Sequence, residues 1–178
     1  MWCGLDMKEY IVTVDEQDRI TGSIEKLEAH IKGVLHRAFS IVILNDKKEI
    51  LLQKRDSCKY HSPGLWSNTC CSHQRVGETL SEATNRRLLE EMGFTCELTE
   101  IFHFIYQTKF DNDLTEHELD HVFVGQYHGD INVNPSEVED YKWISYDDLM
   151  KDMKENAENY TYWFHVLMNR IEMKEYLS

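Results

Sequence analysis

The chain has 178 residues, 42% hydrophobic and 29% charged, which is ordinary for a globular protein and enough for a single domain with a substantial core. Its 19 basic and 32 acidic residues give a net charge of −13, which argues against a nucleic-acid partner because phosphate backbones bind basic surfaces. No apolar run approaches the roughly 20 residues that span a bilayer, and the first residues lack the basic and apolar regions of a signal peptide. A small anionic substrate stays compatible with this charge if local cations or divalent metals offset it.

The hydrophobic pattern predicts an α/β or α+β sandwich in which strands alternate with a few helices. We expect strands at residues 10–14, 35–44, 50–54, 66–71, 96–109 and 116–127. We expect helices at residues 79–92, 146–155 and 158–177. The first of these helices should end at Gly93, because glycine is the usual residue just beyond a helix C-terminus.

Some of the nine histidines have a spacing that suits metal binding. His30 and His36 lie six residues apart at the start of a predicted strand, and Glu116 and Glu118 share one face of another. Together with His73, these residues offer three imidazoles and two carboxylates, a set that suits Mn²⁺, Zn²⁺ or Mg²⁺. Each pair alone is more often solvated or structural. The remaining histidines have no convincing partner in the sequence, and we expect them to be structural or exposed: His61, His103, His117, His121, His128 and His165.

The cysteines point to free thiols. Their odd number and irregular spacing do not match a zinc ribbon or a disulfide framework, so a reducing cytoplasm is the expected environment. The five residues are Cys3, Cys58, Cys70, Cys71 and Cys96. In a strand the adjacent Cys70 and Cys71 must point to opposite faces, and a buried apolar role is the commoner one for either. His73 should share the face of Cys71.

Residues 72–94 resemble the Nudix box, a loop–helix–loop in which glutamates bind Mg²⁺ beside a diphosphate. The matching positions are Glu78, Arg86, Glu90, Glu91, Gly93 and Phe94. Two positions depart from the pattern: Ser72 replaces the opening glycine, and Arg87 replaces a glutamate that hydrolases use around their metals. An arginine binds no Mg²⁺ but can grip phosphate oxygens, so the resemblance to hydrolases is weakened here.

Three further segments make nearly the whole chain resemble the type I isopentenyl-diphosphate isomerases. The most specific is Gly-Leu-Trp-Ser-Asn-Thr-Cys-Cys-Ser-His at residues 64–73. Glu-His-Glu-Leu-Asp-His-Val-Phe at residues 116–123 resembles the strand with the family's catalytic glutamate, and residues 25–40 resemble the segment with its first metal-binding histidines. Separate motifs in the correct order arise by chance far less often than any one of them.

The resemblance implies a role for each matching position. The implied catalytic residues are Cys71, Glu118, Tyr106 and Trp163. The implied diphosphate contacts are Lys26, Arg55, Lys59, Ser72 and Arg87, and Glu91 is implied as the ligand of a diphosphate-bridging Mg²⁺. A second divalent metal, Mn²⁺, Zn²⁺ or Mg²⁺, is implied at His30, His36, His73, Glu116 and Glu118. Without the resemblance, we would interpret Lys26, Arg55 and Lys59 as solvated surface charges. Trp163 would be interpreted as part of a helix core.

The implied protein is a cytoplasmic, monomeric isomerase made of one Nudix-like domain over residues 1–178. Its mixed central sheet should lie between helices, with extra N-terminal strands and a C-terminal helix. The implied reaction interconverts isopentenyl and dimethylallyl diphosphate through a tertiary carbocation, with Cys71 as the base and Glu118 on the proton-donating side. A Nudix pyrophosphohydrolase acting on nucleoside diphosphate compounds is the main alternative. A non-catalytic module that binds metal or diphosphate is the third, although it leaves the cysteine without a task.

Overall fold

The computed structural model describes residues 8–59, 62–110 and 112–178, so Cys3 and His61 lie outside the described residues. The strands are β1 (Tyr10–Val14), β2 (Ile20–Glu25), β3 (His36–Leu44), β4 (Ile50–Arg55), β5 (Trp66–Ser67), β6 (Cys70–His73), β7 (Leu98–Lys109), β8 (Thr115–Gln126) and β9 (Val138–Ile144). The helices are α1 (Lys26–Lys32), α2 (Leu80–Met92), α3 (Tyr146–Glu155), α4 (Tyr162–Asn169) and α5 (Ile171–Leu177), with a 3₁₀ turn at Ala157–Asn159.

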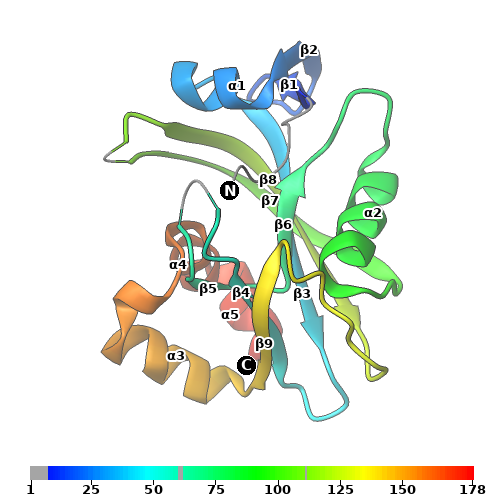
Figure 1. Cartoon of the computed structure of the whole chain (residues 1–178), viewed down its shortest axis with the longest axis vertical. Helices are drawn as coiled ribbons and strands as arrows, with labels where there is room; N and C mark the ends of the chain where they lie inside the picture. The colour runs from blue at the N-terminus through cyan, green and yellow to red at the C-terminus, as the bar shows by residue number, and fades with distance from the viewer. Residues whose placement is uncertain (1–7, 60–61, 111) are drawn as a thin grey trace.

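Within the described ranges, nine strands form one mixed sheet in which β3 is central (Figure 1). β3 runs parallel to β8, from the pair His36–Glu118 to the pair Leu44–Gln126, and antiparallel to β6. Single residue pairs join β3 to β1 and to β4. β2 lies beside β1, β7 lies beside β8, and both β5 and β9 pair with β4. Strands remote in the sequence therefore meet around β3.

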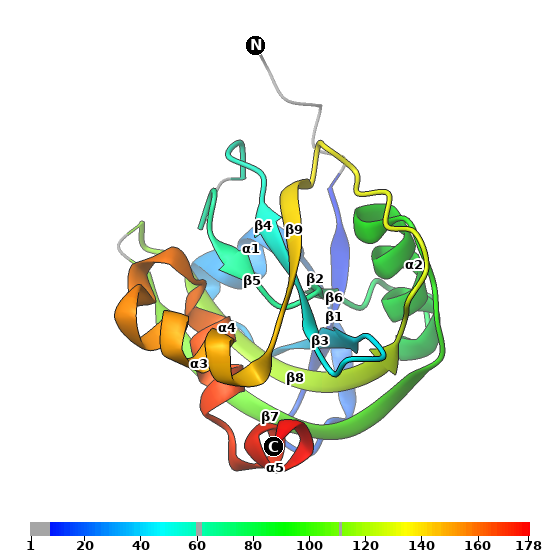
Figure 2. The same cartoon turned by 90° about the horizontal axis from the view of Figure 1, so that it is seen from below.

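Helices cover the sheet from two sides. α2 lies on one side, and α3, α4 and α5 lie on the other (Figures 1 and 2). All nine residues of β3 are buried, which requires apolar cover on both of its faces. Ile41 packs in the apolar cluster of Leu88 from α2, whereas Val42 packs in the cluster of Leu149 and Phe164 from α3 and α4. This architecture confirms the predicted mixed sheet between helices.

α2 ends at Gly93 as the sequence predicts, and a capping box marks its start. Thr79 and Glu82 form a reciprocal capping box at its N-terminus, each side chain bonding the other's backbone N–H. Gly93 follows its last turn with φ 78°, a left-handed conformation that favours glycine. A Cβ at this position would lie 2.2 Å from the backbone oxygen of Asn132. The start and end of this helix are therefore fixed locally.

The predicted single helix over residues 158–177 is wrong, because the chain breaks it twice. Tyr160 and Thr161 are extended, and the Thr161 N–H donates to the carbonyl of Trp66 at 3.0 Å instead of continuing a helix. Arg170 is extended as well, with its guanidinium 4.8 Å from the Phe104 ring centroid. Tertiary contacts thus override a helical hydrophobic period.

The strand predicted at residues 66–71 is divided into β5 and β6 by two buried polar side chains. The Asn68 amide donates to the Ile41 carbonyl at 3.0 Å, and the Thr69 hydroxyl donates to the Leu51 carbonyl at 2.7 Å. These side chains replace ladder bonds that a continuous strand would make. The hydrophobic pattern gave no residue range for β2, α1 or β9: α1 has only seven residues, β2 is largely exposed, and only Val138 of β9 is fully buried.

Free thiols were predicted, and the cysteines in the described ranges are all free: Cys58, Cys70, Cys71 and Cys96.

In the same ranges, no helix combines the length and apolar character needed to cross a membrane.

Candidate active site

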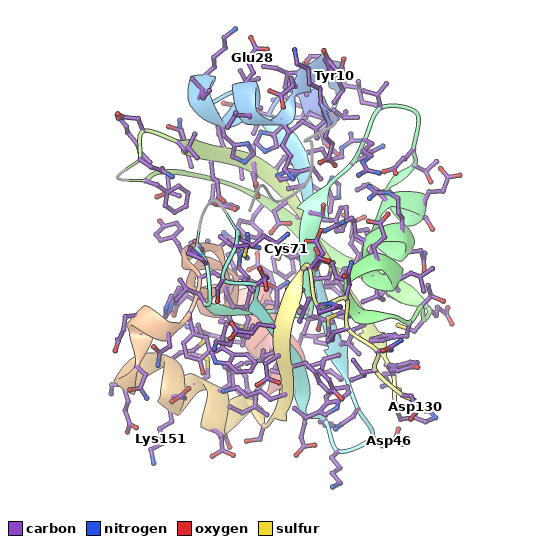
Figure 3. All side chains as sticks on the ribbon, in the orientation of Figure 1. Tyr10, Glu28, Asp46, Cys71, Asp130 and Lys151 are labelled. Atoms are coloured by element: carbon purple, nitrogen blue, oxygen red, sulfur yellow. The ribbon has the colours of Figure 1, made fainter. Side chains whose placement is uncertain are left out.

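One pocket gathers nearly all of the predicted site residues. It encloses about 630 Å³, including its open mouth. Figure 3 shows Cys71, one of its lining residues, near the middle of the molecule. Of the predicted site residues, only His30 and His36 do not line it. The lining residues are Lys26, Phe39, Ser40, Arg55, Lys59, Cys71, Ser72, His73, Arg87, Glu91, Tyr106, Glu116, Glu118 and Trp163.

Strand pairing around β3 places the two predicted catalytic groups. Cys71 on β6 pairs with Ser40, and Glu118 on β8 pairs with His36, so both flank β3 from its two sides. Two strand spacings separate their strands, about 9–10 Å. Both side chains line the pocket, whereas Cys70 is fully buried in the apolar cluster beneath α2. The predicted opposite orientation of the two cysteines is confirmed.

Three imidazoles and one carboxylate converge at the N-terminal end of β3. α1 contributes His30, β3 contributes His36 and β6 contributes His73, and their ring centroids lie 4.9–5.5 Å apart. Glu118 Oε1 is 3.0 Å from His73 Nε2 and 3.5 Å from His36 Nε2. One ligand atom from each of the four residues lies within 4.8 Å of the others.

The geometry of this cluster fits a divalent metal. The Nδ1 atoms of His30 and His36 lie 2.6 Å and 2.8 Å from the carbonyl oxygens of Lys26 and Val34, contacts that orient each ring and leave its Nε2 available. His36 Nε2 is buried without a hydrogen-bond partner, the arrangement expected of an atom that receives a metal. Burial also lowers the pKa of His73 to about 3, so its imidazole is neutral, as a ligand must be.

Glu116 joins the site through Tyr106 instead of contacting the imidazoles. The Tyr106 hydroxyl lies 3.0 Å from Glu116 Oε2 and 2.7 Å from Glu118 Oε2. Burial and the neighbouring charge of Glu118 raise the pKa of Glu116. Burial acts in the same direction on Glu118, but its contacts with the His36 and His73 imidazoles outweigh it and hold that pKa below its ordinary range. The surroundings therefore shift the pKa values of the two carboxyl groups in opposite directions.

The Cys71 thiol is partly buried beside three polar side chains. Its thiol donates to Asn68 Oδ1 at 3.0 Å, and Sγ is 3.6 Å from the hydroxyl of Ser40. Ser40 in turn donates to Asp120 Oδ2 at 2.8 Å. Burial and the proximity of Asp120 raise the pKa of the Cys71 thiol. The sequence did not identify these three neighbours, because their position depends on the pairing of β3 with β6 and β8.

The predicted diphosphate contacts form a partly neutralised basic wall. Lys59 and Arg87 both face Glu137, which no sequence pattern singled out, and Arg87 also pairs with Glu91. The second oxygen of Glu91 accepts a 2.7 Å hydrogen bond from the Gln53 amide. The guanidinium of Arg55 and the ammonium of Lys26 complete the wall, and Ser72 lies between Cys71 and His73 on β6.

Trp163 closes the pocket from the helical side. Its indole N–H donates to the Ser67 hydroxyl at 2.9 Å, which fixes the plane of the ring. The guanidinium of Arg55 lies 5.1 Å from the ring centroid, within the range of a cation–π contact. A buried aromatic face with a fixed orientation is therefore available to an apolar or cationic ligand.

Comparisons with known proteins identify the family of the chain. The family model described as the NUDIX domain matches residues 34–164. The chain is 45% identical over 165 residues to isopentenyl-diphosphate Delta-isomerase 2 of Aromatoleum aromaticum, which covers 93% of this chain and 87% of the relative. It is 48% identical over 161 residues to isopentenyl-diphosphate Delta-isomerase of Pectobacterium atrosepticum, which covers 90% of each chain.

Solved structures resemble the fold at lower identity. A Deinococcus radiodurans protein superposes with a TM-score of 0.75 at 17% identity, over 91% of this chain and 98% of the other. A MutT Nudix hydrolase of Burkholderia pseudomallei gives a TM-score of 0.61 at 21% identity, over 77% and 98%. The family match and the high coverage of the relatives lead to one conclusion. The chain belongs to the Nudix family and, within it, to the isopentenyl-diphosphate Delta-isomerases.

Proposed function

We propose that this protein interconverts isopentenyl diphosphate and dimethylallyl diphosphate. The observation that carries the proposal is the pair formed by Cys71 and Glu118, which flank β3 and line one pocket. The reaction adds a proton at C4 of the alkene and removes one from C2, so it needs two proton-transfer groups around one small substrate. The names of the relatives and the separation of the two strands support this assignment.

The two sides of the pocket would divide the proton transfers. On one side, Tyr106 holds a proton 2.7 Å from Glu118, because burial raises the pKa of its hydroxyl. A raised pKa makes this hydroxyl a weaker acid, so the expected proton-donating role of Glu118 and Tyr106 rests on their 2.7 Å contact at the pocket wall. On the other side, Cys71 must release its own proton before it can accept one from C2, since burial raises its pKa. Asn68 and Ser40 are the groups that contact this thiol as it changes charge.

The tertiary cation that forms between the two transfers requires protection from water, which would convert it to an alcohol. We propose that Trp163 covers it, because its π face lines the pocket and attracts positive charge. Its hydrogen bond to Ser67 keeps the ring in place, and the guanidinium of Arg55 lies 5.1 Å from the ring centroid.

The diphosphate would bind the basic wall of Lys26, Arg55, Lys59, Ser72 and Arg87. These residues offset the net charge of −13 locally, which an anionic substrate requires. Glu91 would contribute one carboxylate to a Mg²⁺ whose other ligands are diphosphate oxygens and water, the mode that Mg²⁺ prefers. A diphosphate entering the site must compete with Glu137 for Lys59 and Arg87.

The histidine cluster would hold a second divalent ion, Mn²⁺, Zn²⁺ or Mg²⁺, on His30, His36, His73 and Glu118, with Glu116 close by through Tyr106. Such an ion supplies positive charge that favours the ionised form of Glu118 and makes nearby protons easier to release. Imidazole donors favour the first two metals over the third.

A direct test is incubation with isopentenyl diphosphate and Mg²⁺ in D₂O, followed by NMR. Deuterium should enter a methyl group of dimethylallyl diphosphate. Unchanged substrate in the presence of metal would exclude the isomerase. Release of phosphate or pyrophosphate from nucleoside diphosphate compounds would instead support the hydrolase, which is less supported because Arg87 stands where hydrolases have a metal-binding glutamate. A single domain, a monomer and a cytoplasmic location remain predictions.

A further inference from the structure

A second group of metal-type ligands lies on β7 and β8, away from the pocket. Glu100, His103 and His121 each offer one ligand atom, and these atoms all lie within 4.8 Å of one another. Successive side chains of a strand point to opposite faces. His121 directly follows Asp120, so it projects from the face of β8 opposite to Glu118 and Asp120. We propose that these three residues bind a divalent transition ion of the zinc class, with Asp18 supporting the site.

A bulge in β7 brings the three side chains to one face. His103 pairs directly with His121 across the two strands, so their side chains share a face. Glu100 is three residues from His103, and in a regular strand it would point to the other face. The register shifts between Glu100 and Phe102, and the additional residue reverses the alternation. The bulge therefore turns the Glu100 side chain to the face that carries His103 and His121.

The distances are close to those of a tetrahedral site. Glu100 Oε1 lies 2.6 Å from His121 Nδ1 and 3.6 Å from His103 Nδ1, and the two rings have centroids 5.2 Å apart. Ligands bound at about 2.0–2.1 Å in a tetrahedron are on the order of 3.3 Å from one another. Small side-chain rotations therefore suffice to place an ion between the three atoms.

Asp18 and Arg37 supply the outer support that metal-binding histidines usually have. His121 Nε2 lies 3.1 Å from Asp18 Oδ2, so its second nitrogen faces a carboxylate while Nδ1 faces the site. That nitrogen is buried and has no well-aligned hydrogen bond, and the His121 side chain is only 5% exposed. Asp18 is itself held by Arg37 Nε at 2.8 Å. The imidazole is therefore oriented before any ion arrives.

The donor set determines the class of ion. Two imidazoles and one carboxylate are a known zinc ligand set, and they leave a fourth position for water. Access from solvent is open, because the side chains of His103 and Glu100 are 56% and 37% exposed. Since Asp18 belongs to the turn between β1 and β2, the bound ion would fasten that turn to the β7–β8 pair. Without metal, the His121 imidazole would only contact the carboxylates of Glu100 and Asp18, and a zinc count distinguishes the two arrangements.

The test counts zinc ions per chain. Metal-free full-length protein is dialysed against buffered Zn²⁺ and analysed by atomic emission. The wild type should bind one equivalent more than the variant Glu100→Gln/His103→Ala. His128→Ala is a matched control, because His128 is a surface histidine 3.8 Å from the carboxylate of Asp46, and it should bind as much as the wild type. Circular dichroism verifies that each variant is folded.

Equal zinc content in the wild type and the double variant would overturn the site, as would an equal loss in the control. In a second measurement, Co²⁺ should broaden the NMR signals of residues 100–103 in the wild type and not in His103→Gln. Unbroadened signals in the wild type would also contradict the site. Isomerase activity should change less than about twofold in these variants, because none of them contacts the pocket. The zinc count is independent of turnover, so it stands or fails separately from the proposed function.

Discussion

Two clusters of imidazoles and carboxylates lie on opposite faces of β8, and they differ mainly in burial. On the pocket face, the side chains of His36, His73 and Glu118 are 0%, 12% and 9% exposed. On the other face, His121 is buried but His103 and Glu100 are open to solvent. The residue types are nearly the same. Burial orients the donors, excludes water and shifts their pKa values, so we propose catalysis at the first face and metal binding alone at the second.

The strongest test of this comparison removes the groups assigned to proton transfer. Cys71→Ala and Glu118→Gln should each lower kcat/KM for isopentenyl diphosphate by about 10³-fold or more, since a positioned acid or base contributes about 10²–10⁴-fold. Cys70→Ala is the matched control: this thiol is adjacent but packs beneath α2, and its loss should change kcat/KM by less than about fivefold. Near-normal turnover in either site variant would remove that residue from the mechanism.

Metal removal should lower the thermal stability of the protein mainly through the buried cluster, which distinguishes the two clusters. An ion at about a thousand times its dissociation constant stabilises the folded state by about 4 kcal/mol. For a chain of this size, loss of the ion from the buried cluster should lower the Tm by about 10 °C. His36→Gln should abolish this metal-dependent shift in calorimetry, whereas Glu100→Gln should leave most of it. A shift that persists in His36→Gln would place the stabilising ion elsewhere.

Local sequence signals predicted the parts of the site that depend on short segments. Cys71, His73 and Arg87 lie in or beside one loop–helix motif, whose ends Thr79 and Gly93 determine through local hydrogen bonds and backbone conformation. Alternation correctly predicted that Cys70 and Cys71 point to opposite faces. These features need no knowledge of which strands are neighbours.

Features that depend on strand pairing were not accessible from the sequence. Ser40 contacts the Cys71 thiol only because β6 pairs with β3. His103 and His121 had no visible partner, because the bulge that turns Glu100 toward them leaves no signature in residue types. The C-terminal helix was predicted as continuous because hydrophobic periodicity does not reveal the contact between Thr161 and Trp66.

A smaller effect is expected at the aromatic wall of the pocket. Trp163→Phe keeps a ring but loses the hydrogen bond to Ser67 and part of the π surface. We expect kcat to fall about tenfold, equivalent to about 1.4 kcal/mol, with KM changed less than threefold, because the interaction develops with the cation. Steady-state kinetics measures both values. A rise in KM at constant kcat would instead assign Trp163 to ground-state binding.

The smallest expected effect concerns Glu9, which links segments next to the buried histidine cluster. Glu9 accepts hydrogen bonds from Arg75 at 2.9 Å and from Lys26 at 3.4 Å, and so links the segment after β6 to the first turn of α1. Burial would raise the pKa of Glu9, but Lys26 and Arg75 outweigh it and lower that pKa to about 2. Because the folded pKa is below the unfolded value of about 4.5, the stabilisation is present above pH 4.5 and is lost as the pH falls through 2.

Glu9→Gln should therefore lower the free energy of unfolding by about 1–2 kcal/mol at pH 6, and by progressively less toward pH 2. Urea unfolding at pH 6, 4 and 3 measures the trend, and a difference that stays constant with pH would show that Glu9 acts through packing rather than through its charge.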